Sequence, residues 1–120
     1  MKTKPYLKFL ILLIFSVSLA SCSKCGKITA VSPDEVHQGE IVSVIIVGVN
    51  TSFLVWEFLD VAFIPSNGID LRGECSVRTN NELECQIEIA EDAELGPRTI
   101  VITNGDCLAV KANALEILEP

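Results

Sequence analysis

Residues 83–89 read Leu-Glu-Cys-Gln-Ile-Glu-Ile, and this stretch has the clearest periodicity in the 120-residue chain. Apolar side chains occupy its odd-numbered positions, and glutamate or glutamine occupies the even-numbered ones. Successive side chains of a β-strand point to opposite faces of the sheet, so a period of two predicts a strand with one buried face. We therefore expect an all-β protein built around this strand.

Other runs of β-type composition flank this strand and end at residues that favour turns. The runs are 28–31, 41–49, 61–64, 69–78, 98–103 and 108–118. The turns between them include 32–34, 37–40, 65–68, 79–81 and 104–106. Only the segment 53–59 has a pattern compatible with a helix. About seven short strands at this spacing predict a two-sheet β-sandwich.

The N-terminus has the pattern of a secretory signal peptide. Lys2, Lys4 and Lys8 form a basic head, and the uncharged, mostly apolar stretch from Phe9 to Ala20 follows. As a helix, this stretch would be about 18 Å long, short of the ~30 Å hydrocarbon core of a membrane. A cleaved signal peptide therefore fits the sequence better than a transmembrane helix.

The end of that segment, Leu19-Ala20-Ser21-Cys22, resembles the lipobox of bacterial lipoproteins. The resemblance implies cleavage before Cys22 and attachment of fatty acid, such as palmitate, to that cysteine. An ordinary cleaved signal peptide with a free Cys22 is the alternative. We expect residues 1–21 to form the cleaved signal peptide, residues 22–27 a lipidated N-terminus with a short tether, and residues 28–120 the β-sandwich.

The same resemblance implies where the protein resides. A lipid on Cys22 would anchor it to a membrane of the bacterial cell envelope, and Ser23 in the next position favours the outer membrane where the cell has two membranes. Only Ser23 and Lys24 separate the lipid from Cys25. At ~3.5 Å per residue, the tether would reach only about 10 Å.

The charge of the chain argues against nucleic acids as partners. The whole chain carries −7 at pH 7, and loss of three signal-peptide lysines would leave six basic residues against sixteen acidic ones. The remaining basic residues are scattered and form no stripe that would neutralise phosphates. Nucleic-acid binding is therefore excluded, and we expect acylation rather than charge to hold the protein on a membrane.

The five cysteines favour disulfides in an oxidising compartment. With Cys22 assigned to the lipid, Cys25, Cys75, Cys85 and Cys107 remain, and four cysteines permit three pairings. Their wide spacing argues against zinc, and the C-x-x-C of Cys22 and Cys25 would indicate redox chemistry only without the lipid. Cys75 and Cys85 flank the turn between them symmetrically, which predicts a bridge across two adjacent antiparallel strands.

Several short motifs follow one another through the chain. They are Ile28 with Ser32-Pro33, Gly39-Glu40, Gly48-Val49-Asn50-Thr51-Ser52-Phe53, Val61-Ala62-Phe63, Asn67-Gly68-Ile69, Ala93-Glu94-Leu95-Gly96 and Val101-Ile102-Thr103-Asn104-Gly105. In this order they resemble the IPT/TIG family of immunoglobulin-like domains over roughly residues 28–118. The resemblance implies an Ig-like sandwich without catalytic apparatus, with Gly48 at a bend and Phe53 in the core. It also implies a first strand that runs partly parallel to the last, which predicts the second bridge, Cys25–Cys107.

The segment Phe53–Leu59 carries more large apolar side chains than one face of a strand or short helix can bury. Exposed patches that contain tryptophan commonly bind partners. We therefore select Leu54, Trp56, Phe58 and Leu59 as the candidate partner-binding residues. The alternative is a bulky loop that closes one end of the sandwich.

The expected function is that of a non-enzymatic, membrane-anchored module that contacts a protein of the cell envelope. The alternative is a module that binds envelope glycan or another small ligand through the Leu54–Leu59 segment, with Trp56 as a stacking platform. No catalytic residue, cofactor or metal site is predicted. His37, the only histidine, stands in a predicted turn without a nominated nucleophile, and the acidic stretch 88–94 lacks the ligand order of a calcium loop.

Overall fold

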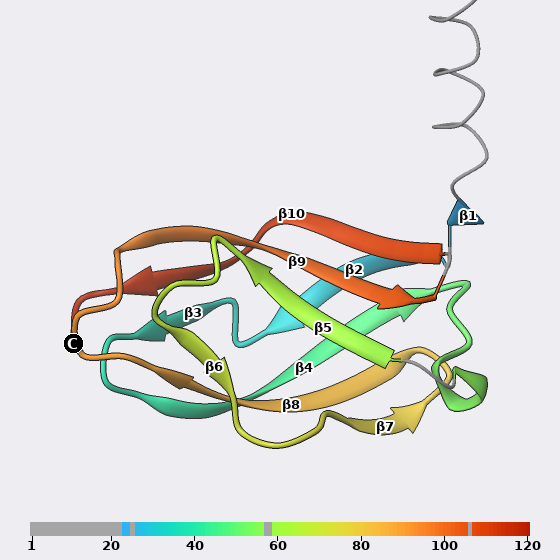
Figure 1. Ribbon diagram of the computed structural model, residues 1–120, viewed down its shortest axis with the longest axis horizontal. Coiled ribbons are helices and arrows are strands. Elements are labelled where there is room, and N and C mark those ends of the chain that lie inside the picture. Colours follow the sequence, from blue (N-terminus) through green and yellow to red (C-terminus); the bar gives the residue numbers. More distant parts are fainter. Residues whose placement is uncertain (1–22, 25, 57–58, 106) are drawn as a thin grey trace, which may run out of the picture.

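The computed structural model describes residues 23–24, 26–56, 59–105 and 107–120 (Figure 1). The predicted signal peptide, the lipobox with Cys22, and the residues Cys25 and Phe58 lie outside the described residues. Among the described residues, no helix is both long enough and apolar enough to cross a membrane.

The described residues form ten β-strands and one short 3-10 helix. The strands are β1 (Ser23–Lys24), β2 (Lys27–Ser32), β3 (Glu35–His37), β4 (Ile41–Val49), β5 (Leu59–Ile64), β6 (Ile69–Leu71), β7 (Ser76–Thr79), β8 (Glu82–Ile89), β9 (Gly96–Asn104) and β10 (Cys107–Leu118), and the helix is η1 (Phe53–Val55). The all-β class predicted from the sequence is confirmed.

The strands are arranged in two sheets that lie over one another as two layers (Figure 1). One sheet has the order β1-β10-β9-β5, with β3 also paired to β10. The other has the order β2-β4-β8-β6, with β7 also paired to β8. Two sheets whose inner faces pack together agree with the predicted β-sandwich.

The core lies between the two sheets and is formed by alternating side chains of their strands. In β8, Leu83, Cys85 and Ile87 are 0% exposed, whereas the residues between them are half-buried or exposed. In β9 the same alternation buries Ile100 and Ile102 from the opposite sheet. Burial of one such aliphatic side chain contributes about 1.5–3 kcal/mol. The period of two in 83–89 therefore determines which face of β8 packs inward.

Two local features differ from the strands expected from the sequence. Residues 35–37 form β3, which pairs in parallel with β10, and its central Val36 is 0% exposed. Three residues are too few to show a period, and the sequence therefore did not predict this strand. His37 ends the strand instead of standing in a turn. The expected strand 69–78 is divided into β6 and β7 around Gly73, whose φ of +79° lies in the left-handed region.

β1 begins directly after the predicted lipidation site and pairs in parallel with β10. Ser23 lies opposite Cys107, and Lys24 lies opposite Leu108. Ser23 and Lys24, which were expected to belong to a tether, therefore form part of the sheet. A strand of two residues leaves no periodic signal in the sequence. The chain then crosses to the other sheet as β2 and returns to β10 as β3. The expected parallel placement of the first segment beside the last strand is thus observed.

Candidate functional site

The candidate segment begins with η1, which both covers the core and exposes apolar side chains. Phe53 is 1% exposed, whereas Leu54 is 60% and Val55 is 74% exposed. Trp56 is half-buried, and its ring and the Phe53 ring form a T-shaped pair with 4.9 Å between centroids and an interplanar angle of 83°. Phe53 and Trp56 therefore close the end of the core, while Leu54 and Val55 point away from it.

A turn from another part of the chain holds η1 in place. The Phe53 amide donates to the Asn80 carbonyl oxygen (3.1 Å), and the Leu54 amide donates to Asn80 Oδ1 (3.2 Å). Thr51 is 6% exposed, and its hydroxyl lies 2.7 Å from Asn81 Oδ1 and 2.5 Å from the Asn80 carbonyl oxygen. The β7–β8 turn thus determines which side chains of the segment face solvent.

Gly48 allows the chain to reach this turn at the end of β4. Its amide donates to the Asn81 carbonyl oxygen (2.8 Å), and a Cβ at this position would lie 2.7 Å from Thr51 Cγ2 and 3.0 Å from the Lys27 carbonyl oxygen. The pairing of β4 with β8 ends at Val47, one residue earlier. Gly48 therefore stands where β4 leaves β8 but still pairs with Ile28 of β2, so the strand does not leave the sheet here. Phe53 lies in the core, as the resemblance implied.

The three predicted partner-binding residues that the structure describes do not form one surface. Leu54 is exposed on η1, Trp56 is half-buried against the core, and Phe58 lies outside the described residues. Leu59 is half-buried at the start of β5 and lines a separate groove. Val55, the most exposed large apolar residue described, was not selected from the sequence, because nothing in a run of apolar residues indicates which of them faces solvent.

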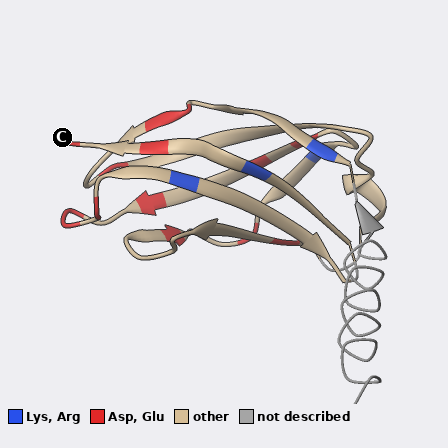
Figure 2. Ribbon diagram, turned by 90° about the horizontal axis from the view of Figure 1, so that it is seen from above, with Lys and Arg blue, Asp and Glu red and all other residues tan. Residues whose placement is uncertain are grey.

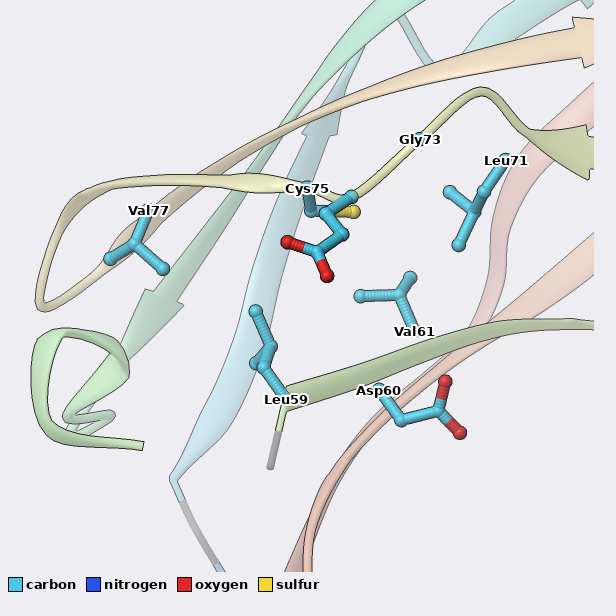
Figure 3. Close-up of a pocket in the computed structure, with 8 residues that line it drawn as sticks. Leu59, Asp60, Val61, Leu71, Gly73, Cys75 and Val77 are labelled. Carbon is cyan, nitrogen blue, oxygen red and sulfur yellow. The ribbon is translucent and has the colours of Figure 1, made fainter. Parts of the chain in front are cut away.

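The groove at Leu59 lies between two sheet edges (Figure 3). One wall is β5 with Leu59, Asp60 and Val61, and the other is the β6–β7 segment. That second wall contributes Leu71, Gly73, Glu74, Cys75 and Val77, and the groove has a volume of about 330 Å³. Among the described strands, β5 pairs with β9 alone, so its other backbone edge borders this groove.

The predicted bridge between Cys75 and Cys85 is present. Ser76 lies opposite Glu84 in the antiparallel pair of β7 and β8. The register therefore brings Cys75, just before Ser76, opposite Cys85, just after Glu84, and their Cα atoms are 4.3 Å apart. Cys85 is fully buried, whereas Cys75 borders the groove. The disulfide therefore ties the groove wall to the core.

The second predicted bridge, Cys25–Cys107, involves a residue outside the described part of the chain. Cys107 is itself disulfide-bonded, and its strand position lies opposite Ser23. The identity of its partner stays a prediction. The pairing of β1 with β10 does place the start of the described chain beside Cys107, as that prediction requires.

Arg98 has a structural role that the sequence did not indicate. It is 2% exposed, and its guanidinium donates to the carbonyl oxygens of Glu94 (2.8 Å), Pro97 (3.3 Å) and Asn67 (3.4 Å). Its Nε has no hydrogen-bond partner. The side chain thus joins the loop before β9 to the loop before β6.

The remaining candidates for chemistry from the sequence are His37 and the acidic stretch 88–94. His37 Nδ1 donates to the Glu119 carbonyl oxygen (2.6 Å), which holds the C-terminal residues beside β3. No group of three or more histidine, cysteine, aspartate or glutamate side chains in the described part of the chain is arranged to hold a metal ion.

Neither the models of known protein families nor the curated protein sequences match the chain.

Proposed function

We propose that the protein is a non-enzymatic, lipid-anchored Ig-like module of the bacterial cell envelope that acts by contact with another protein. The anchor is inferred from the resemblance of Leu19-Ala20-Ser21-Cys22 to a lipobox, and the IPT/TIG-like motifs suggest the Ig-like family. The anchor favours a protein that works at a membrane surface, and the Ig-like family favours one that acts without catalysis.

The observation that supports protein contact is the edge of β5 beside the groove. Of the described strands, only β9 pairs with β5, so the six residues Leu59–Ile64 present one row of backbone groups without a neighbouring strand. Such an edge is a template for an added strand, and an adjoining groove can select the side chains of that strand. Leu59 and Val61 supply apolar contacts in the groove. The partner we expect is an extended segment of an envelope protein.

The alternative of a glycan-binding module gains no support from Trp56. A stacking platform needs an open ring face, whereas Trp56 is half-buried and packs against Phe53. We therefore retain protein contact as the proposed function.

Site-specific photo-cross-linking in cells tests this function. A photoreactive residue replaces Ile64, which is 54% exposed on β5, and in a matched control it replaces the exposed Thr29 on β2, the edge strand of the other sheet. We expect one cross-linked protein from position 64 and none from position 29. The product should disappear when Asp60→Arg is added on the same edge. Equal products from both edges, or a product that survives Asp60→Arg, would contradict contact through β5.

A further inference from the structure

Three exposed apolar side chains gather at one end of the sandwich, which we call the N-terminal end because β1 lies there (Figure 1). Leu54 and Val55 are 60% and 74% exposed on η1, and Val49 is 46% exposed at the end of β4. Val49 lies opposite Lys27, the first residue of β2. The apolar side chains and the beginning of the described chain therefore share this end, opposite the one that holds the C-terminus.

The proposed lipid would sit directly against this end. Ser23, the residue after Cys22, is already paired with Cys107 in β1. One residue spans at most ~3.5 Å, so an acyl chain on Cys22 would bring the N-terminal end to the membrane without an intervening flexible linker. Leu108, which lies opposite Lys24, adds a further apolar side chain that is 39% exposed.

The charges of the domain are distributed unevenly along its length. Acidic residues gather toward the end that holds the C-terminus (Figure 2). This C-terminal end carries Glu40, Glu88, Glu91, Asp92, Glu94, Glu116 and Glu119. Of the basic residues near it, Arg98 is buried and Arg72 forms an ion pair with Glu88 (3.4 Å).

The N-terminal end, in contrast, is close to neutral. Among the described residues it carries Lys24, Lys27 and Arg78 together with Asp60 and Glu82. Anionic lipids repel acidic surfaces, so contact of the N-terminal end with a membrane is electrostatically more favourable than contact of the C-terminal end.

We propose that the N-terminal end of the sandwich rests on the lipid bilayer, with Leu54 and Val55 inserted at the level of the headgroups. This inference depends on the membrane anchor in the proposed function. The exposed apolar area is small, and alone it would bind a membrane weakly. Once a lipid holds the domain at the surface, the exposed apolar side chains stay close to the bilayer, and their effective concentration there is high. A weak contact is then sufficient to orient the domain. The part of the β5 edge near Ile64 lies farther from this end and is then left free for a protein partner.

Trp56 provides a built-in reporter of this contact, because it follows Val55 and is the only tryptophan in the chain. The full chain is reconstituted into vesicles of phosphatidylethanolamine and phosphatidylglycerol, with and without phosphatidylcholine brominated near the top of its acyl chains. Bromine quenches tryptophan only at short range. We expect quenching of Trp56 in the brominated vesicles.

Two double variants make the test specific. Leu54→Asp with Val55→Asp should reduce the quenching about twofold or more, because charges on η1 oppose insertion. Ile41→Asp with Leu95→Asp is the matched control, since these residues are 50% and 45% exposed near the opposite end. The control should be quenched like the wild type. Circular dichroism establishes that both variants retain the β-sheet signal of the wild type.

Separate readouts distinguish this inference from the anchor on which it depends. Mass spectrometry reports acylation of Cys22, and flotation reports attachment to the vesicles. A chain that floats without quenching of Trp56, or with equal loss in both double variants, overturns membrane contact and leaves the anchor standing. A chain that floats through its uncleaved apolar segment without acylation overturns the anchor, and the quenching still decides the contact. A chain that does not float overturns both.

Discussion

Arg98 carries a buried positive charge whose hydrogen-bond partners are backbone carbonyl oxygens. Arg98→Met retains much of the side-chain volume but leaves these carbonyls without their donor. We expect this substitution to lower the free energy of unfolding by about 1–3 kcal/mol. Urea denaturation followed by Trp56 fluorescence measures the change, with the exposed Arg78→Met as control. Equal stability of Arg98→Met and the wild type would show that the guanidinium contacts contribute nothing net.

Alanine substitutions at Gly68 and Gly73 distinguish two causes of destabilisation, backbone strain and steric overlap. Both have positive φ, +86° and +79°, but only at Gly68 would a Cβ meet other atoms, at 2.6 Å from Ala93 Cβ and 2.8 Å from its Cα. Gly73→Ala should cost about 1–2 kcal/mol from the left-handed conformation. Gly68→Ala should cost a further 1–3 kcal/mol or so, because the Ala93 backbone must move. Thermal unfolding of the two variants compares them, and a smaller loss at Gly68 would contradict the packing described for this loop.

The position of η1 depends on contacts with the β7–β8 turn, so it is tested at the scale of that element. Thr51→Val retains the shape of the side chain but removes its hydroxyl from Asn80 and Asn81. We expect a loss of about 1–3 kcal/mol and a red-shifted Trp56 emission as η1 loosens. Thr29→Val removes an exposed hydroxyl that donates to the Val47 carbonyl oxygen (3.2 Å) and serves as control. An unchanged emission spectrum in Thr51→Val would contradict the role given to this turn.

The two predicted disulfides join elements at very different separations along the chain. In the chain-entropy model, the 10-residue separation of Cys75 and Cys85 contributes ~2.5–3 kcal/mol, and the much longer Cys25–Cys107 loop contributes ~4.5 kcal/mol. Replacing Cys25 and Cys107 by serine should therefore lower Tm more than replacing Cys75 and Cys85. Peptide mapping without reduction determines the pairing. A Cys22–Cys107 peptide would contradict both the second bridge and acylation of Cys22.

At the scale of the whole molecule, the sequence predicted what depends on periodicity and local turn chemistry. Alternation in 83–89 identified the inward face of β8, and the symmetric spacing of Cys75 and Cys85 identified their bridge. The sequence did not reveal β3 or β1, because three and two residues carry no period. These strands exist because β10 offers them an edge.

The candidate site was predicted only in part, for a physical reason. The excess of apolar residues in 53–59 indicated that some would be exposed. Which ones are exposed depends on the hydrogen bonds that Asn80 accepts from the η1 amides and that the Thr51 hydroxyl makes to Asn80 and Asn81. These two asparagines lie nearly thirty positions further along the chain. The groove at Leu59 likewise requires the β6–β7 segment as its second wall. Contacts between distant segments of this kind leave no local pattern in the sequence.

Attachment of a lipid to Cys22 is the claim on which the place of the protein, the orientation of the sandwich and the availability of β5 all depend. Metabolic labelling with a fatty-acid analogue tests it most directly, in cells that express the wild type or Cys22→Ala. We predict that the wild type incorporates the label and that its mature chain begins at Cys22, whereas Cys22→Ala incorporates none. Label in Cys22→Ala, or an unlabelled wild-type chain, would contradict the lipid anchor.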